Sequence, residues 1–481
     1  MKKHKVLIEI IIFVVLLCLM LAVCYDVLRY KDTGDLGGHG RLYDNYYDID
    51  APIDVMVYGA SHAGCTVDNS ILWKESGIAS FTLSSGAQQA FGTYYYMKDS
   101  FRHNKPKIAL VETALMGTDE PEDDTLYRST LVPRFNGYFV PYILDFASRH
   151  DIDRETVEEL ILRMPIVHSR YAELARGDVV NETKYSLGYI GDNAVTACDP
   201  PAVTDRREPL PENAIYYMDK IMELCDKSGV QLVFFNAPFS ATEEERALQN
   251  SVRDYITEKG YPYIGFMDAD APCEIDYSND LREYSHLNNN GAAKVTRALA
   301  EYMLANYDLT DRRGDPAYAL WDLHSRFMED RELGYALQAA PDPATYLYTL
   351  AADTRGCTYI ISLNGFFNAL GDELLLPGLN AVGVDAASYA NGGVFVVRNG
   401  QIVSATPAAE EYSVYYAMEN DSDLNIWRNA GDEFATIKLD ATDLSPDKNG
   451  ISVAVFDETC SYLIDSMYVD VFTGTDVRRE E

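Results

Sequence analysis

A serine and a histidine that lie far apart in the chain have neighbours that suit acyl-transfer chemistry. Ser61 belongs to the sequence Gly59-Ala60-Ser61-His62, directly after an apolar stretch, where a strand would give way to a turn. His286 ends the sequence Glu283-Tyr284-Ser285-His286, so a carboxylate precedes the imidazole by three residues. A serine hydroxyl becomes a nucleophile when a neighbouring base takes its proton, and a carboxylate can orient that base. These residue types therefore predict one site with Ser61 as nucleophile, His286 as base and Glu283 as orienting acid.

Alternating strands and helices predict an α/β domain that would position these residues. Expected strands cover 53–58, 79–84, 107–112, 230–235 and 263–267, and expected helices cover 88–103, 212–228, 243–259 and 291–306. Near-continuous apolar strands between amphipathic helices indicate a parallel sheet that is covered on both faces. Such sheets bind ligands beyond the carboxyl ends of their strands, which is where Ser61 lies.

Three short blocks in this region carry a likeness to a known family. They are Gly59-Ala60-Ser61-His62, Leu83-Ser84-Ser85-Gly86-Ala87-Gln88, and Glu283-Tyr284-Ser285-His286-Leu287-Asn288 with Gly291-Ala292 following. Together they resemble the SGNH/GDSL hydrolase superfamily, and more closely its membrane-anchored branch of DltD-type and AlgX/AlgJ-type alginate-acetylation proteins. The resemblance covers about 51–307. It implies a three-layer α/β fold, the Ser61–His286–Glu283 site, an oxyanion hole that includes the Gly86 N–H, and no metal or organic cofactor.

Two features depart from the pattern of that superfamily. The superfamily has an aspartate where this chain has Glu283, so Asp280 is an alternative acid, and an acid could also be dispensable. The block that supplies an oxyanion asparagine is not evident. Asn236, after the fourth expected strand, is a candidate, and a strand-end turn residue is the other interpretation.

Several neighbours of these blocks are candidates for substrate contact. His62 could contact substrate or pack against the turn, and Gln88 could line the crevice or cap the following helix. Glu112, at the end of an expected strand, could face the same crevice or the surface. Ser61 by itself has the position of a helix N-cap, which is the structural alternative to a nucleophile.

The N-terminus predicts a membrane anchor at 1–25. Met1-Lys2-Lys3-His4-Lys5 precedes an apolar run from about Val6 to Tyr25 that only Glu9 interrupts, enough to cross a hydrocarbon core about 30 Å thick. The preceding lysines place the N-terminus in the cytoplasm and the rest of the chain outside. A cleaved signal peptide is the alternative, although no small-x-small cleavage site follows the run. Residues 26–50 are polar and are expected to form a stalk.

Composition argues against two classes of ligand. The net charge of −35 argues against nucleic acid, whose phosphates require a basic surface. The six cysteines beyond the anchor are scattered, without a CxxC pair or metal-ligand spacing, so no metal site is expected.

The chain has further parts around and after the α/β domain of 51–307. An insertion over 119–210 is expected to be helical near 154–163, and is either a lid or substrate wall or a structural elaboration. A linker and helix over 308–342 precede a β-rich domain over 343–481, and Asn399-Gly400 predicts a hairpin. Its expected strands are 346–351, 358–363, 393–398, 401–403, 412–418, 434–439, 451–456 and 462–472.

The strand 358–363, the hairpin and 450–472 loosely resemble the interleukin-like (ILEI/PANDER-type) β domain over about 343–475. The resemblance implies a compact β fold without catalytic residues. Contact with glycan or protein is one interpretation, and a structural appendage is the other.

Taken with the resemblance, the chain is expected to be a bacterial single-pass envelope protein that transfers or hydrolyses acyl esters, of O-acetyl or D-alanyl type. The expected acceptor is an envelope or exported glycan or a teichoic-acid-like polymer, and a multi-spanning membrane protein could deliver the acyl donor. A catalytically inactive SGNH-fold protein for glycan binding or assembly is the first alternative. An envelope lipase or thioesterase is the second.

Overall fold

The computed structural model consists of two compact units, Met1–Ser325 and Arg326–Glu481. It describes residues 2–31, 39–120, 130, 138–174, 178, 181, 184–364, 375–385, 392–407, 411–418, 423–440, 442–470 and 477–478. The boundary falls inside helix α13 (Ala319–Gln338), within the stretch expected to be a linker and helix. The expected mixed α/β class is confirmed, with a parallel sheet in the first unit and antiparallel sheets in the second.

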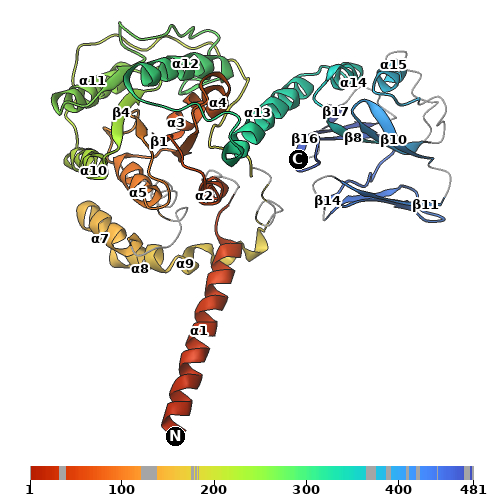
Figure 1. Ribbon diagram of the computed structural model, residues 1–481, viewed down its shortest axis with the longest axis horizontal. Coiled ribbons are helices and arrows are strands. Elements are labelled where there is room, and N and C mark those ends of the chain that lie inside the picture. Colours follow the sequence, from red (N-terminus) through yellow and green to blue (C-terminus); the bar gives the residue numbers. More distant parts are fainter. Residues whose placement is uncertain are drawn as a thin grey trace. The chain divides into compact units, whose positions relative to one another are not determined.

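A five-stranded parallel sheet in the order β2-β1-β3-β4-β5 organises the first unit (Figure 1). The strands are β1 (Val55–Gly59), β2 (Ser80–Ser84), β3 (Ile108–Glu112), β4 (Gln231–Asn236) and β5 (Tyr263–Gly265). Every residue of β1, β2 and β3 is buried, so these strands are covered on both faces. The strand order reverses between β1 and β3, and such a switch point opens a crevice at the carboxyl ends of the strands.

Helices and one small hairpin complete the first unit. The helices are α1 (Lys2–Leu28), α2 (His39–Tyr47), α3 (Ser61–Thr66), α4 (Asn69–Ser76), α5 (Ala90–Ser100), α7 (Phe139–His150), α8 (Arg154–Leu162), α9 (Met164–Val167), η2 (His168–Ala172), α10 (Glu212–Ser228), α11 (Glu243–Glu258), α12 (Asn289–Asn306) and η4 (Pro316–Tyr318). Helix α10 ends as expected at Gly229, which adopts the left-handed conformation. Helix α12 begins earlier than expected because Asn288 caps the N–H groups of Asn290 and Gly291.

Helix α1 is the element that could cross a membrane. Its segment Ile8–Leu28 has a mean hydropathy of 2.9 and is not buried against the rest of the first unit. In length and apolar character it suffices for one span, as the sequence predicted, and it is the only such helix among the described residues.

The insertion of 119–210 is described in part. Residues 138–172 form α7, α8, α9 and η2, which agrees with the helix expected near 154–163. Residues 121–129, 131–137, 175–177, 179–180 and 182–183 lie outside the described residues. From 184 to 210 the chain has neither helix nor strand, as expected.

The second unit contains a six-stranded antiparallel sheet in the order β10-β9-β8-β15-β16-β17 and a four-stranded sheet in the order β11-β12-β13-β14. The strands are β8 (Thr358–Leu363), β9 (Gly393–Arg398), β10 (Gln401–Pro407), β11 (Tyr412–Ala417), β12 (Asp423–Arg428), β13 (Thr436–Leu439), β14 (Thr442–Asp443), β15 (Gly450–Phe456), β16 (Leu463–Asp470) and β17 (Val477–Arg478). One core joins the two sheets, and another joins the six-stranded sheet to α13, α14 (Pro343–Ala352) and α15 (Leu375–Ala381). The hairpin expected at Asn399-Gly400 connects β9 and β10.

The strand expected at 346–351 is wrong, because this segment lies inside helix α14. Asp342 caps the helix by accepting a hydrogen bond from the Thr345 N–H at 2.8 Å, and Pro343 occupies its first turn. Tyr346, Leu347 and Leu350 then lie on one face and enter the core. A short apolar run is compatible with the periodicity of a strand and with that of a helix, and here the Asp342 cap favours the helix.

Replacing Asp342 tests this cap. We expect Asp342→Ala to lower the unfolding free energy of the second unit by about 1 kcal/mol, whereas Asp342→Asn, which retains an acceptor, should change it by a few tenths. Hydrogen exchange at increasing urea concentrations, followed on peptides from 343–352, measures both. Equal effects of the two substitutions would contradict the cap.

Candidate active site

Ser61 occupies a sharp connection between β1 and α3. Gly59 ends β1 with a φ of +146°, and a Cβ atom there would lie 2.8 Å from the Cβ of Glu112 and 3.2 Å from that of Ala63. Only glycine fits this conformation and this space. The N-cap of α3 is Ala60, without a side-chain capping bond, so the alternative of Ser61 as an N-cap is wrong. Ser61 is instead the first helical residue, at the carboxyl edge of the sheet.

Glu283 and His286, the predicted acid and base, lie on a hairpin that the sequence analysis missed. Strands β6 (Leu281–Glu283) and β7 (His286–Leu287) are antiparallel, and Glu283 is paired directly with His286 across the two-residue turn. Opposite residues of such a pair project to the same side. The spacing of three residues, which the sequence showed, therefore becomes direct contact between the two side chains.

The three predicted residues form one hydrogen-bonded chain. The Nε2 atom of His286 lies 2.7 Å from the Oγ atom of Ser61, and its Nδ1 atom is hydrogen-bonded to a carboxylate oxygen of Glu283. Asp280, the alternative acid, is engaged elsewhere, since its carboxylate accepts bonds from the Lys294 Nζ and the Asp276 N–H. The structure thus brings together Ser61, His286 and Glu283.

Ser285, in the turn of the hairpin, is the supporting residue that sequence reasoning did not assign. Its N–H and its hydroxyl both donate to Oε2 of Glu283 at 2.9 Å. The same hydroxyl also lies 3.1 Å from Oε1 and 3.1 Å from the Nδ1 atom of His286, so Ser285 holds the whole carboxylate beside the imidazole. The sequence feature that could have identified this role is the position of Ser285, directly before His286 and two residues after Glu283.

Burial and hydrogen bonding set the charge state of the pair. Burial lowers the pKa of His286 below its usual 6.5, although Glu283 acts in the opposite direction. Burial alone would raise the pKa of Glu283, but the bonds from the Ser285 N–H and from His286 outweigh it, so that pKa lies below its usual 4.5. At neutral pH the pair is a neutral imidazole beside a carboxylate. This is the state that a general base requires.

His62 lies beside the base and is almost completely buried. Its ring centroid is 4.9 Å from that of His286 and 5.2 Å from that of Phe239, and the side chain is 9% exposed. Neither ring nitrogen has a hydrogen-bond partner among the described residues. Burial, helped by His286, lowers the pKa of His62 to about 3, so its ring is neutral. His62 therefore packs against the His286 ring, and its two ring nitrogens make no hydrogen bond to the described residues.

The other predicted residues lie at different places around the crevice. The Ser85 N–H donates to the Gly59 carbonyl at 3.4 Å, which brings the loop containing Gly86 to the end of β1. Gln88 uses its amide within this loop, accepting from the Ser85 hydroxyl and donating to that of Thr93. It therefore braces the loop.

Asn236 is not brought against Ser61. It ends β4, two strands and about 10 Å from β1. Its Oδ1 accepts a bond from the Phe266 N–H at 2.6 Å, while its buried Nδ2 has no partner among the described residues. The bond to the Phe266 N–H is typical of a residue that holds a turn at the end of a strand, and it favours that interpretation over an oxyanion contact.

Glu112 is the last residue of β3, the strand that lies between β1 and β4 in the sheet, and its side chain is buried. Its Oε1 accepts the N–H groups of Ala114 and Ala237, and its Oε2 has no partner among the described residues. Burial raises the pKa of Glu112 to about 7, despite these backbone donors. A surface position for Glu112 is therefore wrong.

Part of the insertion forms a wall that joins the two halves of the site. The Ile190 N–H donates to the Gly64 carbonyl in α3, and the Thr196 N–H donates to the Leu281 carbonyl in β6. Asn288, directly after the hairpin, donates to the Ala194 carbonyl. Residues 190–196 thus tie the helix that carries Ser61 to the hairpin that carries His286.

No protein-family model matches the chain, and no curated protein matches it either. Among the described residues there is also no group of three or more His, Cys, Asp and Glu side chains that could hold a metal ion. The site is accordingly interpreted from its own geometry.

Replacing Gly59 tests the connection that positions Ser61. We expect Gly59→Ala to lower the unfolding free energy of the first unit by at least about 2 kcal/mol, through backbone strain and the overlap with Glu112. Gly229→Ala is the matched control, because Gly229 also has a positive φ but has open space around it, and should cost about 1 kcal/mol. Urea denaturation measures both. Equal losses would contradict a crowded connection at Gly59.

Proposed function

We propose that the chain is an SGNH-type serine acyltransferase or esterase of the bacterial cell envelope. The observation that carries the proposal is the hydrogen-bonded chain from Ser61 through His286 to Glu283. Nucleophile, base and acid in contact, at the carboxyl edge of a parallel sheet, form the arrangement that activates a serine for attack on an acyl carbon. The resemblance of the three sequence blocks to the SGNH/GDSL superfamily agrees with this geometry.

The proposed reaction uses Ser61, His286 and Glu283 in two successive attacks. The Ser61 Oγ attacks the carbonyl carbon of the donor ester while its proton moves to Nε2 of His286, and Glu283 stabilises the imidazolium. The leaving alcohol then takes this proton from His286, and the acyl group remains as an ester on Ser61. An acceptor hydroxyl, or water in an esterase, gives its proton to His286 and attacks that ester. The Ser61 Oγ then leaves the acyl carbon and takes the proton back from His286, which restores the free site.

The negative charge on the carbonyl oxygen needs donors during both attacks. Ser61 begins α3, and the first N–H groups of a helix have no partner within the helix. The loop after β2 brings Gly86 towards the same edge. We assign the oxyanion hole to the N–H groups of Ser61 and Gly86, and assign no oxyanion contact to Asn236.

The substrate class follows from the expected location. With the lysine-rich N-terminus in the cytoplasm and α1 across the membrane, the rest of the first unit and the second unit lie outside, where envelope and exported glycans are the available acceptors. An acceptor hydroxyl on such a glycan or on a teichoic-acid-like polymer, and an acetyl or D-alanyl donor group, fit this chemistry. A multi-spanning membrane protein is the proposed source of the donor, and glycan or protein contact is the proposed role of the second unit.

Labelling with a fluorophosphonate probe tests whether Ser61 is a nucleophile. The wild-type protein should be labelled at Ser61, whereas Ser61→Ala and His286→Asn should lower the labelling rate by at least about 10³-fold. Ser278→Ala is the matched control and should be labelled at the wild-type rate, because it removes an exposed serine that is not part of the Ser61–His286–Glu283 chain. Gel fluorescence and mass spectrometry of the labelled peptide measure the outcome.

Two results would contradict the proposal. If wild type and Ser61→Ala are labelled equally, Ser61 is not the nucleophile. If the wild type is not labelled while a thermal shift shows that glycan binds, the inactive binding protein is the correct function.

The rate of ester hydrolysis should depend on pH through His286. Only the neutral imidazole accepts a proton, and burial holds its pKa below 6.5, so kcat/KM for p-nitrophenyl acetate should fall as the pH drops through a value below 6.5. Glu283→Gln removes the charge that favours the imidazolium. We therefore expect this substitution to move the acid limb to still lower pH and to lower the plateau. A limb that moves to higher pH would contradict the assignment of Glu283.

A further inference from the structure

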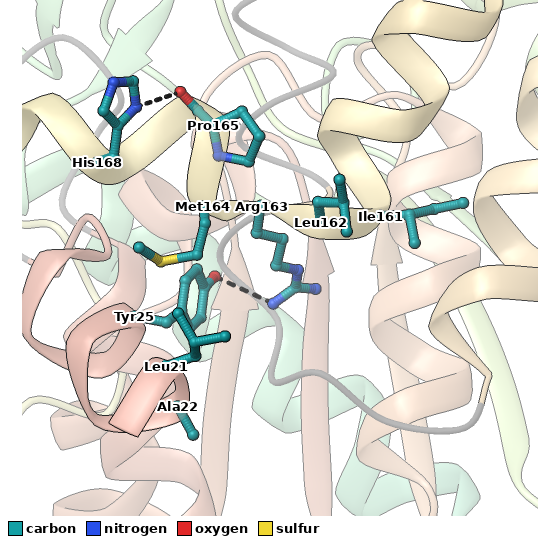
Figure 2. A pocket seen from close by; sticks show the side chains of 9 residues that line it. All are labelled: Leu21, Ala22, Tyr25, Ile161, Leu162, Arg163, Met164, Pro165 and His168. Carbon is teal, nitrogen blue, oxygen red and sulfur yellow. Dashed lines mark hydrogen bonds between the residues drawn. The ribbon is translucent and has the colours of Figure 1, made fainter. Parts of the chain in front are cut away.

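An apolar pocket of about 830 Å³ lies between the C-terminal end of α1 and the segment from α8 to η2, outside the candidate active site. Leu21, Ala22 and Tyr25 contribute its wall from α1, and Leu162 and Met164 are among the residues opposite (Figure 2). Its size is that of a small-molecule site. The reaction proposed for Ser61 does not use it.

The position of the pocket along α1 indicates what surrounds it. The apolar segment Ile8–Leu28 has 21 residues, which at 1.5 Å per residue extend over about 32 Å, close to the thickness of a hydrocarbon core of about 30 Å. Leu21 is then about 10 Å before the outer boundary, and Tyr25 lies near it, where tyrosine is favoured. The pocket therefore opens where acyl chains meet headgroups, and water does not fill an apolar space at that depth.

Hydrogen bonds hold the α8–η2 segment against the end of α1. Arg163 donates to the Tyr25 hydroxyl at 3.1 Å, the bond drawn in Figure 2. Arg170 donates to the carbonyls of Leu28 and Arg29 at 2.8 Å each, and pairs with the buried Asp178. These bonds satisfy carbonyls that the last turn of α1 leaves open. The position of α1 in the membrane therefore also sets the depth at which the α8–η2 segment lies.

The same segment exposes large apolar side chains. Leu162 is 65% exposed and Tyr171 is 74% exposed, and Leu174, two residues beyond the end of η2, is 41% exposed. Single exposed apolar residues are ordinary, but a group beside a membrane span marks an interaction surface. A segment that lies in the interface buries such side chains among the lipids.

We propose that α8, α9 and η2 lie in the outer interface of the membrane, and that the pocket holds an acyl chain of an outer-leaflet phospholipid. The depth of Leu21 and Tyr25 selects lipid as the occupant, because lipid is what surrounds α1 there. The proposal rests on the location proposed above, with α1 across the membrane and the rest of the first unit outside it. It does not rest on acyl transfer.

Fluorescence quenching by brominated lipid tests the interface. The full chain is reconstituted in phosphatidylcholine vesicles with or without bromine on the acyl chains, and the wild type supplies the background of its native tryptophans. The added fluorescence of Leu162→Trp should fall by at least half in brominated vesicles. Val203→Trp, at a fully exposed position of the first unit on another segment, should lose no more than the wild type. Equal quenching of the two variants would overturn the proposal.

Lipid that remains bound in detergent tests the pocket. Native mass spectrometry of the full chain should show bound phospholipid, and Ala22→Trp, which fills the pocket, should lower it by at least half. Ile12→Trp, elsewhere on α1, is the matched control and should retain the wild-type amount. If the wild type and Ala22→Trp retain equal amounts of lipid, the pocket does not hold an acyl chain and the proposal is overturned. Quenching and lipid retention both report contact with lipid and do not depend on catalysis. Ser61→Ala should therefore behave as the wild type in both measurements, even if the proposed acyl transfer is wrong.

Discussion

The close approach of β1 and β3 at Gly59 is the constraint on which the candidate site depends. Because Gly59 has no side chain, the end of β1 can pass within contact of Glu112 and Ala63 and turn into α3 after a single further residue. The turn places the Ser61 hydroxyl above the switch point of the sheet. Any side chain at Gly59 would displace α3, and with it the hydroxyl that His286 contacts.

A second, equally short connection supplies the other half of the site. The turn of Tyr284 and Ser285 pairs Glu283 with His286 by backbone geometry, and Ser285 holds the carboxylate. The Glu283 side chain therefore reaches the imidazole, since the hairpin sets a distance that this side chain spans. The segment 190–196 then joins the hairpin to α3, so the two connections are held together by main-chain bonds.

The surroundings of Glu283 and His286 favour an ionised carboxylate beside a neutral imidazole. Burial makes a charged imidazole costly, and the carboxylate of Glu283 offsets part of that cost, so His286 is neutral but able to accept a proton. His62 and Glu112 add buried polar atoms near the carboxyl edge of the sheet that have no hydrogen-bond partner among the residues the structure describes. Such atoms are costly unless something else satisfies them, and a bound substrate is one source of partners.

The sequence by itself determined the residue types, most of the local elements, and a helix long and apolar enough to cross a membrane. Helix α10 was predicted at its observed bounds because an amphipathic period and Gly229 are local signals, whereas 346–351 was assigned wrongly because a short apolar run fits helix and strand alike. Strands as short as β6 and β7 have no period to detect. Only the tertiary structure decided that Glu283 rather than Asp280 meets His286, that Ser61 is not a cap, and that Asn236 lies two strands away. These outcomes depend on strand order and on contacts between segments far apart in the chain, which local patterns do not encode.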